Sequence, residues 1–377
     1  MCFIIYRVGL ITGQSILFCN PKVIIMPRSY FFSFVILLSG ILHAQSDNDS
    51  YILQPANTPN PGQQAHIDRR YGMFMHFGIN TFNDKEWSDG TLDPSTYNPP
   101  EIDADQWVSS AKKAGMKYVV MISKHHDGFC LWDSKYTTYD VGSSGNKTNV
   151  VEAVAKACKK YEMGLGIYYS IWDRHQNPKT TDPSLDSAYN AYMINQIKEL
   201  FDIASRYVPV IEFWCDGLWT KPAERWPLAE IYTTIKKLSP QCQIGFNNNI
   251  SYPPNTGHHK LIYVKAFKQK EGYPIHYFPT DFRLCDPWVP AANDPKMFTH
   301  DGKSYYLPFE TTMCLSRVWF YHSWDTYLKP LKKMVKTYKA ATANNNILII
   351  NCPPGKNGKL REKDVQRLLE IKKELNL

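Results

Sequence analysis

The feature that most constrains the fold is a regular alternation of short apolar segments with longer amphipathic segments from about residue 65 onward. Each apolar segment is almost continuously hydrophobic, which is typical of parallel strands that are covered on both faces. The predicted strands are 71–78, 117–126, 165–171, 210–217, 242–249, 305–313 and 346–354, and the helical segments include 103–115, 149–164, 188–206 and 327–344.

A seven- or eightfold strand–helix alternation over about 300 residues favours a (β/α)8 TIM-like barrel over an open sheet. The first predicted strand is not followed by G-x-G-x-x-G, which weakens the dinucleotide-binding alternative. Residues 66–377 are therefore predicted to form a single α/β barrel, closed by a C-terminal helix and without a C-terminal β-sandwich. Residues 250–304 interrupt the alternation and are expected to lie on the binding face.

The N-terminal residues have the pattern of an export signal. A basic start at Met26–Arg28 precedes an apolar run and the small residue Ala44, after which the chain becomes polar. We expect cleavage after Ala44, with residues 1–25 upstream of the true start and residues 45–65 forming a linker. An uncleaved membrane anchor is the alternative; no other apolar run approaches the length of a membrane span. The expected location is periplasmic or secreted.

Charge and cysteine content exclude other classes. The formal net charge of +8 falls to about +5 without the leader, whose charged residues are Arg7, Lys22 and Arg28. Such a small, unclustered excess does not indicate nucleic-acid binding. Outside Cys2 and Cys19 of the leader, seven cysteines remain without C-x-x-C spacing, which predicts buried thiols rather than a disulfide scaffold or a zinc site.

Candidate site residues follow from the barrel prediction, because parallel barrels place their sites at the carboxyl ends of the strands. Asp216, at the end of "EFWCDG", is the most informative, since burying an ionised carboxylate without partners is costly. The polar residues that close the predicted strands are His76, His125, His126, Asp127, Tyr168, Tyr169, Trp214, Asp216, Asn247–Asn249 and Glu310. Imidazoles, acids and aromatic faces together suit a ligand rich in hydroxyl groups.

The same residues also have purely structural interpretations. His76, between Phe74 and Phe77, could be a histidine satisfied within the core. His125 and His126 point to opposite sides of a strand, and a metal site with Asp127 would need a third ligand that the sequence does not reveal. We therefore predict no metal. Glu86 and Trp87 could be an ordinary loop pair.

Several segments together resemble a known family. They are "YGMFMHFGINTF", "EWSDG", "KYVVMISKHHDGFCLWDSKYTTYDV", "LGIYYSIWDRH", "EFWCDG", "FETTMCLSRVWFYH" and "NNNILIINCPPGKNG". In this order they are similar to the blocks of the retaining α-L-fucosidases of glycoside hydrolase family twenty-nine. The resemblance extends from about residue 66 to residue 375, and its most specific parts are the block around His125 and His126 and the W-x-D-G ending.

The resemblance implies an exo-acting enzyme that removes terminal α-L-fucosyl residues with retention of configuration and without a cofactor. Asp216 corresponds to the nucleophile that forms a covalent glycosyl-enzyme. Glu310 corresponds to the proposed acid/base of several members, and Asp281 and Glu271 are rivals for that role.

The resemblance also implies a set of substrate-binding residues. Histidines would hydrogen-bond the fucose hydroxyls, a Glu–Trp pair would close over the ring, and aromatic residues would line the pocket and accept the C6 methyl group. An arginine that members often carry after strand five has no counterpart in "NNNISY", and Arg283 is a possible substitute. The implied binding residues are His76, Glu86, Trp87, His125, His126, Tyr168, Trp214 and Trp319.

The expected partner is a fucosylated oligosaccharide or glycoconjugate, with no nucleic acid and no membrane after signal cleavage; the oligomeric state is left open. Two alternatives remain: a retaining glycosidase for a related galacto-configured sugar, and a catalytically impaired carbohydrate-binding barrel.

Overall fold

The computed structural model describes residues 50–176, 182–254 and 263–377. The leader predicted at residues 1–44 lies outside the described residues. Helix α2 (Pro61–Arg69) begins within the residues expected to form a linker, with Asn60 as its N-cap. In the described ranges, none of the helices combines the length and the apolar character that crossing a bilayer requires.

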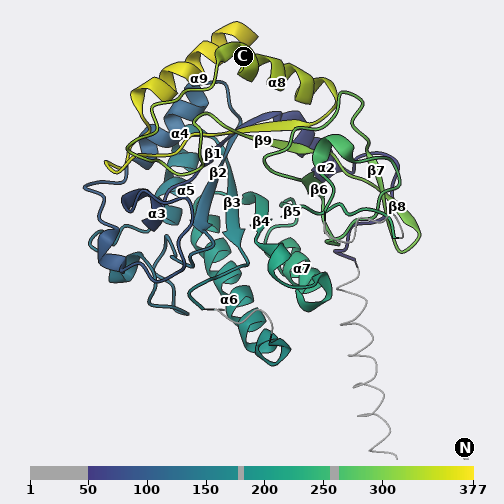
Figure 1. The fold of residues 1–377 in the computed structure, drawn as a ribbon, viewed down its shortest axis with the longest axis horizontal. Coiled ribbons are helices and arrows are strands. Elements are labelled where there is room, and N and C mark those ends of the chain that lie inside the picture. Colours follow the sequence, from purple (N-terminus) through teal and green to yellow (C-terminus); the bar gives the residue numbers. More distant parts are fainter. Residues whose placement is uncertain (1–49, 177–181, 255–262) are drawn as a thin grey trace, which may run out of the picture. The chain divides into compact units, whose positions relative to one another are not determined.

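Eight parallel strands form one sheet in the order β6-β5-β4-β3-β2-β1-β10-β9. They converge at the centre of the ribbon, surrounded by the helices (Figure 1). Most connections therefore join neighbouring strands, as expected for successive β–α units. The strands are β1 (Tyr71–Met75), β2 (Tyr118–Lys124), β3 (Gly164–Ser170), β4 (Val210–Asp216), β5 (Gln243–Asn247), β6 (Phe282–Leu284), β9 (Glu310–Cys314) and β10 (Ile347–Asn351).

The two outermost strands of this order approach each other. Arg283 of β6 forms a parallel bridge with Phe309, the residue before β9, and its backbone N–H donates to the carbonyl of Pro308 at 2.8 Å. The sheet is therefore a nearly closed barrel, and the predicted α/β barrel class is confirmed.

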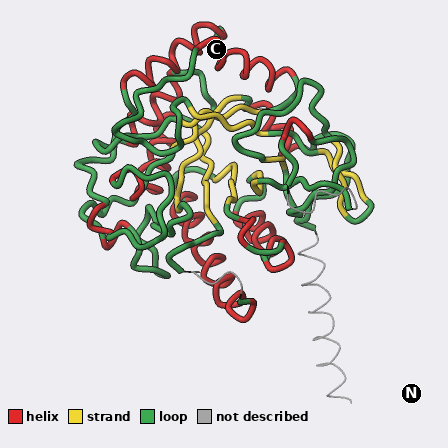
Figure 2. Tube along the Cα trace, in the orientation of Figure 1, coloured by secondary structure: helices red, strands yellow, loops and turns green. Residues whose placement is uncertain are grey.

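The helices lie outside the strands (Figure 2). Helix α5 shows why the sequence folds this way: Asn149 caps its first turn by accepting from the Glu152 N–H at 2.9 Å, and the residues Val150, Val151 and Val154 form its buried face. The main helices after α2 are α3 (Ile79–Phe82), α4 (Ala104–Lys113), α5 (Val150–Tyr161), α6 (Asp186–Ser205), α7 (Leu228–Leu238), α8 (Leu331–Ala343) and α9 (Glu362–Leu375).

One predicted strand is wrong. Segment 305–313 is not continuous: Lys303–Tyr306 forms β8, which pairs antiparallel with β7 (Met297–His300), and a new strand starts at Glu310. Pro308 lies between the two strands, and proline cannot donate to a sheet ladder. Glu310 therefore opens β9 instead of closing a strand. The short strand β6 lies within residues 250–304, which interrupt the predicted alternation.

Strand β4 explains how an acid can end a buried segment. Alternate side chains point to opposite faces, so Glu212, Trp214 and Asp216 face the barrel lumen. Phe213 faces outward and contacts Phe201 of α6, with ring centroids 5.8 Å apart. Glu212 thus lies near the amino end of the barrel and Asp216 at its carboxyl end.

Helix α2 covers the amino end of the barrel. The Gln63 side-chain amide donates to the carbonyls of Asp281 at 2.8 Å and Tyr306 at 2.7 Å. His66, one turn later, is fully buried against Glu212 and Glu310. This end of the lumen is sealed.

Candidate active site

A pocket of about 430 Å³ opens at the carboxyl ends of the strands, a size in the usual range for small-molecule sites. Seven of the eight predicted binding residues and the predicted nucleophile line it, whereas Glu86 and Glu310 do not. Its lining residues are Phe74, His76, Trp87, His125, His126, Tyr168, Trp214, Asp216, Trp219, Asn247, Asn248, Tyr263, Asp286, Pro287 and Trp319.

The Asp216 carboxylate lies in the pocket and accepts several hydrogen bonds. Oδ2 accepts from the Tyr168 hydroxyl at 2.7 Å, and Oδ1 accepts from the Asn247 Nδ2 at 3.0 Å. His126 Nε2 lies 3.5 Å from Oδ2. The Tyr168 hydroxyl and the Asn247 amide suit a negatively charged oxygen and hold the carboxylate in one orientation.

Gly217 has a positive φ of 87°, which a side chain would disfavour. A Cβ atom there would also lie 2.5 Å from the Cβ of Trp172. In this conformation the Gly217 N–H donates to Asp216 Oδ1 at 2.9 Å. The glycine of "WCDG" is therefore required to turn the chain and to position the carboxylate.

A second carboxyl group, Asp286, faces the same pocket. It follows β6, and the Asn247 Nδ2 donates both to its Oδ1 and to Asp216 Oδ1. With hydrogen bonds of about 3 Å, two acceptors on one nitrogen lie at most about 6 Å apart. Burial raises the pKa of Asp286 to about 7, and the charge of Asp216 raises it as well.

Three neutral histidines form one side of the pocket. His76 Nδ1 lies 2.8 Å from the Asn351 Oδ1, and His126 Nδ1 lies 2.7 Å from the Ser170 Oγ. Burial lowers the pKa of His76 to about 3 and that of His126 to about 4, and it lowers the pKa of His125 well below its usual range. A neutral imidazole has one donor and one acceptor, which suits sugar hydroxyls.

Aromatic rings form the rest of the wall. Tyr168 stacks on Trp214 at 5.4 Å and on His125 at 5.6 Å, and Trp319 lies 4.9 Å from His76. Trp87, half of whose surface is exposed, stands at the rim, where its ring is nearly parallel to that of Trp219 at 6.4 Å. The pocket therefore combines an apolar wall with polar groups that converge from several strands.

Glu86 lies outside the pocket and binds the loop that forms part of its aromatic wall. Its carboxylate accepts from the backbone N–H of Trp319 and from that of Phe320 at 2.9 Å. It therefore positions the loop that carries Trp319, and it does not line the pocket.

Glu310 is far from the pocket mouth along its strand. It accepts from the Tyr118 hydroxyl at 2.7 Å and from the Trp214 Nε1 at 3.1 Å, and it is 1% exposed. Tyr118 and Glu310 both open their strands, so this contact lies at the amino end of the lumen. The expectation that Glu310 stands beside Asp216 at the pocket is therefore wrong.

The two rivals for the acid/base role also lie elsewhere. Asp281 accepts from the Tyr232 hydroxyl at 2.6 Å and pairs with Lys236 at 2.7 Å. Glu271 accepts from the backbone N–H of Lys296 and of Met297, both at 2.8 Å, beside the β7–β8 hairpin. Neither lines the pocket.

Two further candidates have structural roles. Arg283 is buried and binds Asp294 through two hydrogen bonds of 3.1 and 2.6 Å, so it does not replace the missing arginine in the pocket. Asp127 accepts from the Asn80 Nδ2 at 2.9 Å and from the Phe129 N–H at 2.7 Å, away from the pocket.

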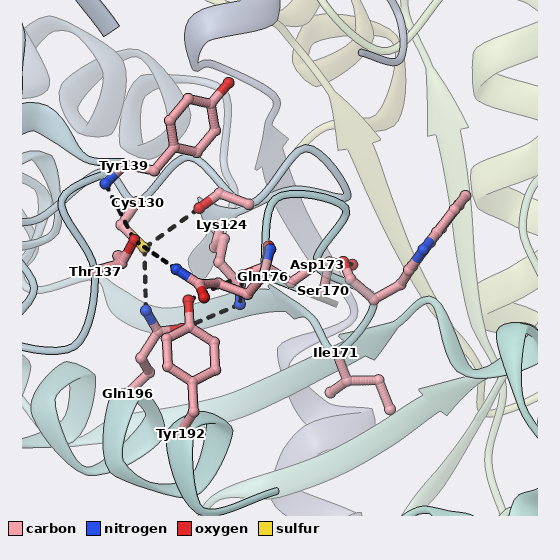
Figure 3. Close-up of polar contacts among 12 residues, drawn as sticks. Lys124, Cys130, Thr137, Tyr139, Ser170, Ile171, Asp173, Gln176, Tyr192 and Gln196 are labelled. Atoms are coloured by element: carbon pink, nitrogen blue, oxygen red, sulfur yellow. Dashed lines mark hydrogen bonds and ion pairs between the residues drawn. The ribbon is translucent and has the colours of Figure 1, made fainter. Parts of the chain in front are cut away.

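Figure 3 shows a buried polar network around Lys124, the last residue of β2. Lys124 Nζ binds Asp173 Oδ2 at 2.8 Å and Gln196 Oε1 at 3.0 Å, and Tyr192 also donates to Asp173 at 2.9 Å. Lys124 directly precedes His125, so this ion pair fixes the backbone from which two pocket histidines project.

In the described part of the chain, one group of three residues could offer close metal ligands: His66, Glu212 and Glu310. It lies at the sealed end, away from the pocket. Asp127 does not join His125 and His126 in a ligand set.

A parallel barrel with two adjacent carboxyl groups in a small aromatic and polar pocket has the arrangement found in glycoside hydrolases. A sequence model of the family described as alpha-L-fucosidase matches residues 42–377. The chain belongs to the alpha-L-fucosidase family.

Individual relatives agree with this assignment. Alpha-L-fucosidase 1 of Arabidopsis thaliana is 31% identical over 359 residues, which cover 91% of this chain. A solved structure of a glycoside hydrolase 29 family member from an unknown rumen bacterium matches with a TM-score of 0.66 at 26% identity, over 86% of this chain. The matched regions span 65% of the plant protein and 58% of the solved chain.

Proposed function

We propose that this protein is an exo-acting, retaining α-L-fucosidase that hydrolyses terminal α-L-fucosyl residues from glycans. Membership of the family supports fucose as the sugar that is released. The pocket supports exo action because it is small and ends on the side chains packed inside the barrel. The observation that carries the proposal is the pair Asp216 and Asp286, joined through one amide nitrogen of Asn247.

In this proposal Asp216 is the nucleophile. One carboxylate oxygen attacks the anomeric carbon, and the bond to the leaving oxygen breaks as the covalent glycosyl-enzyme forms. Retaining glycosidases need a carboxyl separation of about 5 Å, whereas inverting ones leave about 6.5 Å or more for a water molecule. The upper limit of about 6 Å set by the shared nitrogen favours retention.

Asp286 is the acid/base in place of the predicted Glu310. A pKa of about 7 leaves a proton available near neutral pH, and that proton passes to the leaving oxygen in the first step. The resulting carboxylate then removes a proton from the water that hydrolyses the intermediate. The neutral histidines orient the sugar hydroxyls, and the wall formed by Phe74, Trp214 and Trp319 accepts the methyl group.

Export belongs to the same proposal, on the strength of the signal pattern at residues 26–44. The substrate would then be a fucosylated oligosaccharide or glycoconjugate met in the periplasm or outside the cell.

The test is hydrolysis of 4-nitrophenyl α-L-fucoside, compared with 4-nitrophenyl α-L-galactoside as the competing substrate. Proton NMR identifies which anomer of the free sugar is released first. We expect fucoside turnover and initial release of the α-anomer. Release of the β-anomer would refute retention. Preference for the galactoside would refute the sugar assignment, and binding without turnover would favour the carbohydrate-binding alternative.

A further inference from the structure

A second pocket adjoins the active-site pocket and shares two of its walls. Pro287 and Trp319 line both, and the second pocket has a volume of about 240 Å³. It is formed largely by β9, by the loop that follows β9 and by the start of α8. Its other lining residues are Val289, Thr312, Met313, Cys314, Arg317, Lys329 and Lys333.

The charged residues that line this second pocket are all positive. Arg317, Lys329 and Lys333 line it, and none of its lining residues is acidic. Within the described ranges, no carboxylate lies at ion-pair distance from any of these three cationic groups. Burial lowers the pKa of Lys329, and the nearby charge of Lys333 lowers it further. Like charges gathered without a counter-charge favour the binding of an anion.

The threonine of this pocket provides an independent observation. Thr312 is 3% exposed, and its hydroxyl oxygen is buried without a hydrogen-bond partner in the described structure. Buried polar groups in folded proteins are normally satisfied, so the hydroxyl of this lining residue has a hydrogen-bonding capacity that the protein leaves unused. Arg317 is also held in place, with its guanidinium 4.9 Å from the centre of the Tyr327 ring.

The position of the second pocket indicates which part of a substrate would reach it. Pro287 directly follows Asp286, and a general acid must lie beside the oxygen that links the fucosyl residue to its neighbour. The space beyond Pro287 is therefore on the side of the leaving group.

We propose that this second pocket is a subsite for an anionic substituent, a sulfate ester or a carboxylate, on the sugar to which the fucosyl residue is attached. Arg317, Lys329 and Lys333 would neutralise the anion, and the Thr312 hydroxyl would donate a hydrogen bond to it. This inference rests on the proposed fucosidase function and extends it to the class of glycan.

The test compares kcat/KM for three matched fucosyl disaccharides whose second sugar is neutral, sulfated or a uronic acid. We expect at least one anionic substrate to be preferred about tenfold at low salt, and the preference to shrink as sodium chloride is added. The double variant Arg317→Ala/Lys333→Ala should lose the preference and still hydrolyse 4-nitrophenyl α-L-fucoside at the wild-type rate. Lys332→Ala, an exposed neighbour on α8 outside the pocket lining, is the matched control and should keep the preference.

The outcomes separate the two proposals. Without any hydrolysis of the aryl fucoside, the fucosidase function fails. With aryl fucoside turnover but equal kcat/KM for the three disaccharides, the subsite alone fails. A preference that survives the double variant would also overturn the subsite. Thermal melting of each variant checks that it is folded.

Discussion

The two ends of the barrel lumen each hold a pair of carboxyl groups, and the pairs differ in what surrounds them. At the amino end, Glu212 and Glu310 lie under helix α2 with 0% and 1% exposure. At the carboxyl end, Asp216 and Asp286 line an open pocket. Burial raises the pKa of Glu310 to about 7, as it does for Asp286. A raised pKa alone therefore does not distinguish a catalytic acid from a structural one.

Access and hydrogen-bond donors make the difference. Asp216 faces a cavity together with histidines that can hold hydroxyl groups, whereas Glu212 has two buried oxygens without hydrogen-bond partners in the described structure. Aromatic side chains separate the two ends: Trp214 lines the upper pocket, and its Nε1 donates to Glu310 below. Glu212 and Glu310 are therefore enclosed in the core, and only Asp216 and Asp286 can exchange protons with a ligand.

The largest expected effect tests, within strand β4, the division between a catalytic carboxyl pair at the carboxyl end of the barrel and a structural pair at its amino end. Asp216→Asn should lower kcat for 4-nitrophenyl α-L-fucoside by at least about 10³-fold, because the amide cannot attack the anomeric carbon. Glu212→Gln, on the same face of β4, should change kcat by less than about threefold, since it has no contact with the pocket. Steady-state kinetics and thermal melting of both variants would test this. Comparable losses of kcat in two folded variants would refute the division.

The next effect concerns the identity of the acid. Asp286→Asn should lower kcat/KM about 10²- to 10⁴-fold for a substrate with a poor leaving group, and much less for one with an activated aryl leaving group. The wild-type rate should fall as pH rises through about 7, because Asp286 must be protonated to act. This alkaline limb should be absent in Asp286→Asn.

The control for that prediction is Glu310→Gln, since the folded-state pKa of Glu310 is also about 7. We expect this variant to keep the alkaline limb. If the limb disappears with Glu310→Gln and persists with Asp286→Asn, the sequence-based assignment of Glu310 is right and Asp286 is not the acid.

The sequence predicted the barrel and most of the pocket because those signals are local. Apolar strand segments and the polar residues that close them lie next to each other in the chain, so Asp216, His76 and His125 could be placed from the pattern alone. Glu310 could not, since the break at Pro308 decides whether it ends or begins a strand.

Asp286 was missed for a related reason. Strand β6 has three residues, Phe282–Leu284, too few for a hydrophobic period to be recognised within a Pro- and Tyr-rich segment. Had that strand been recognised, the rule that polar residues follow the carboxyl ends of strands would have found Asp286. The bond from Asn247 to both acids depends on the spacing of neighbouring strands, which the sequence does not encode locally.

A smaller effect should appear in stability. Glu310 keeps its proton in the folded state up to about pH 7, whereas an ordinary glutamate loses it near 4.5. Its contribution to the free energy of unfolding is therefore fully present below about pH 4.5 and is lost as pH rises through about 7. At about 1.4 kcal/mol per pKa unit, the loss over this rise in pKa is about 3 to 4 kcal/mol at most.

Denaturant unfolding between pH 4.5 and 8 would measure that slope. Glu310→Gln should flatten it, because the amide does not titrate. Asp286 contributes in the same direction, so Asp286→Asn should remove a separate part of the slope. An unchanged slope in Glu310→Gln would show that Glu310 is ionised in the folded protein.

The smallest expected effect comes from a matched pair of tyrosines. Tyr118 donates to Glu310 Oε2 and Tyr168 donates to Asp216 Oδ2, each at 2.7 Å and each from a buried position. Tyr118→Phe should lower the free energy of unfolding by about 1 kcal/mol and leave kcat within about twofold, since it removes one hydrogen bond from the sealed pair. Tyr168→Phe should cost similar stability, and it should also lower kcat about tenfold because the nucleophile loses a positioning donor. Equal kcat values in the two variants would mean that the orientation of Asp216 does not depend on the Tyr168 hydroxyl, and the donors of Gly217 and Asn247 would then suffice to hold it.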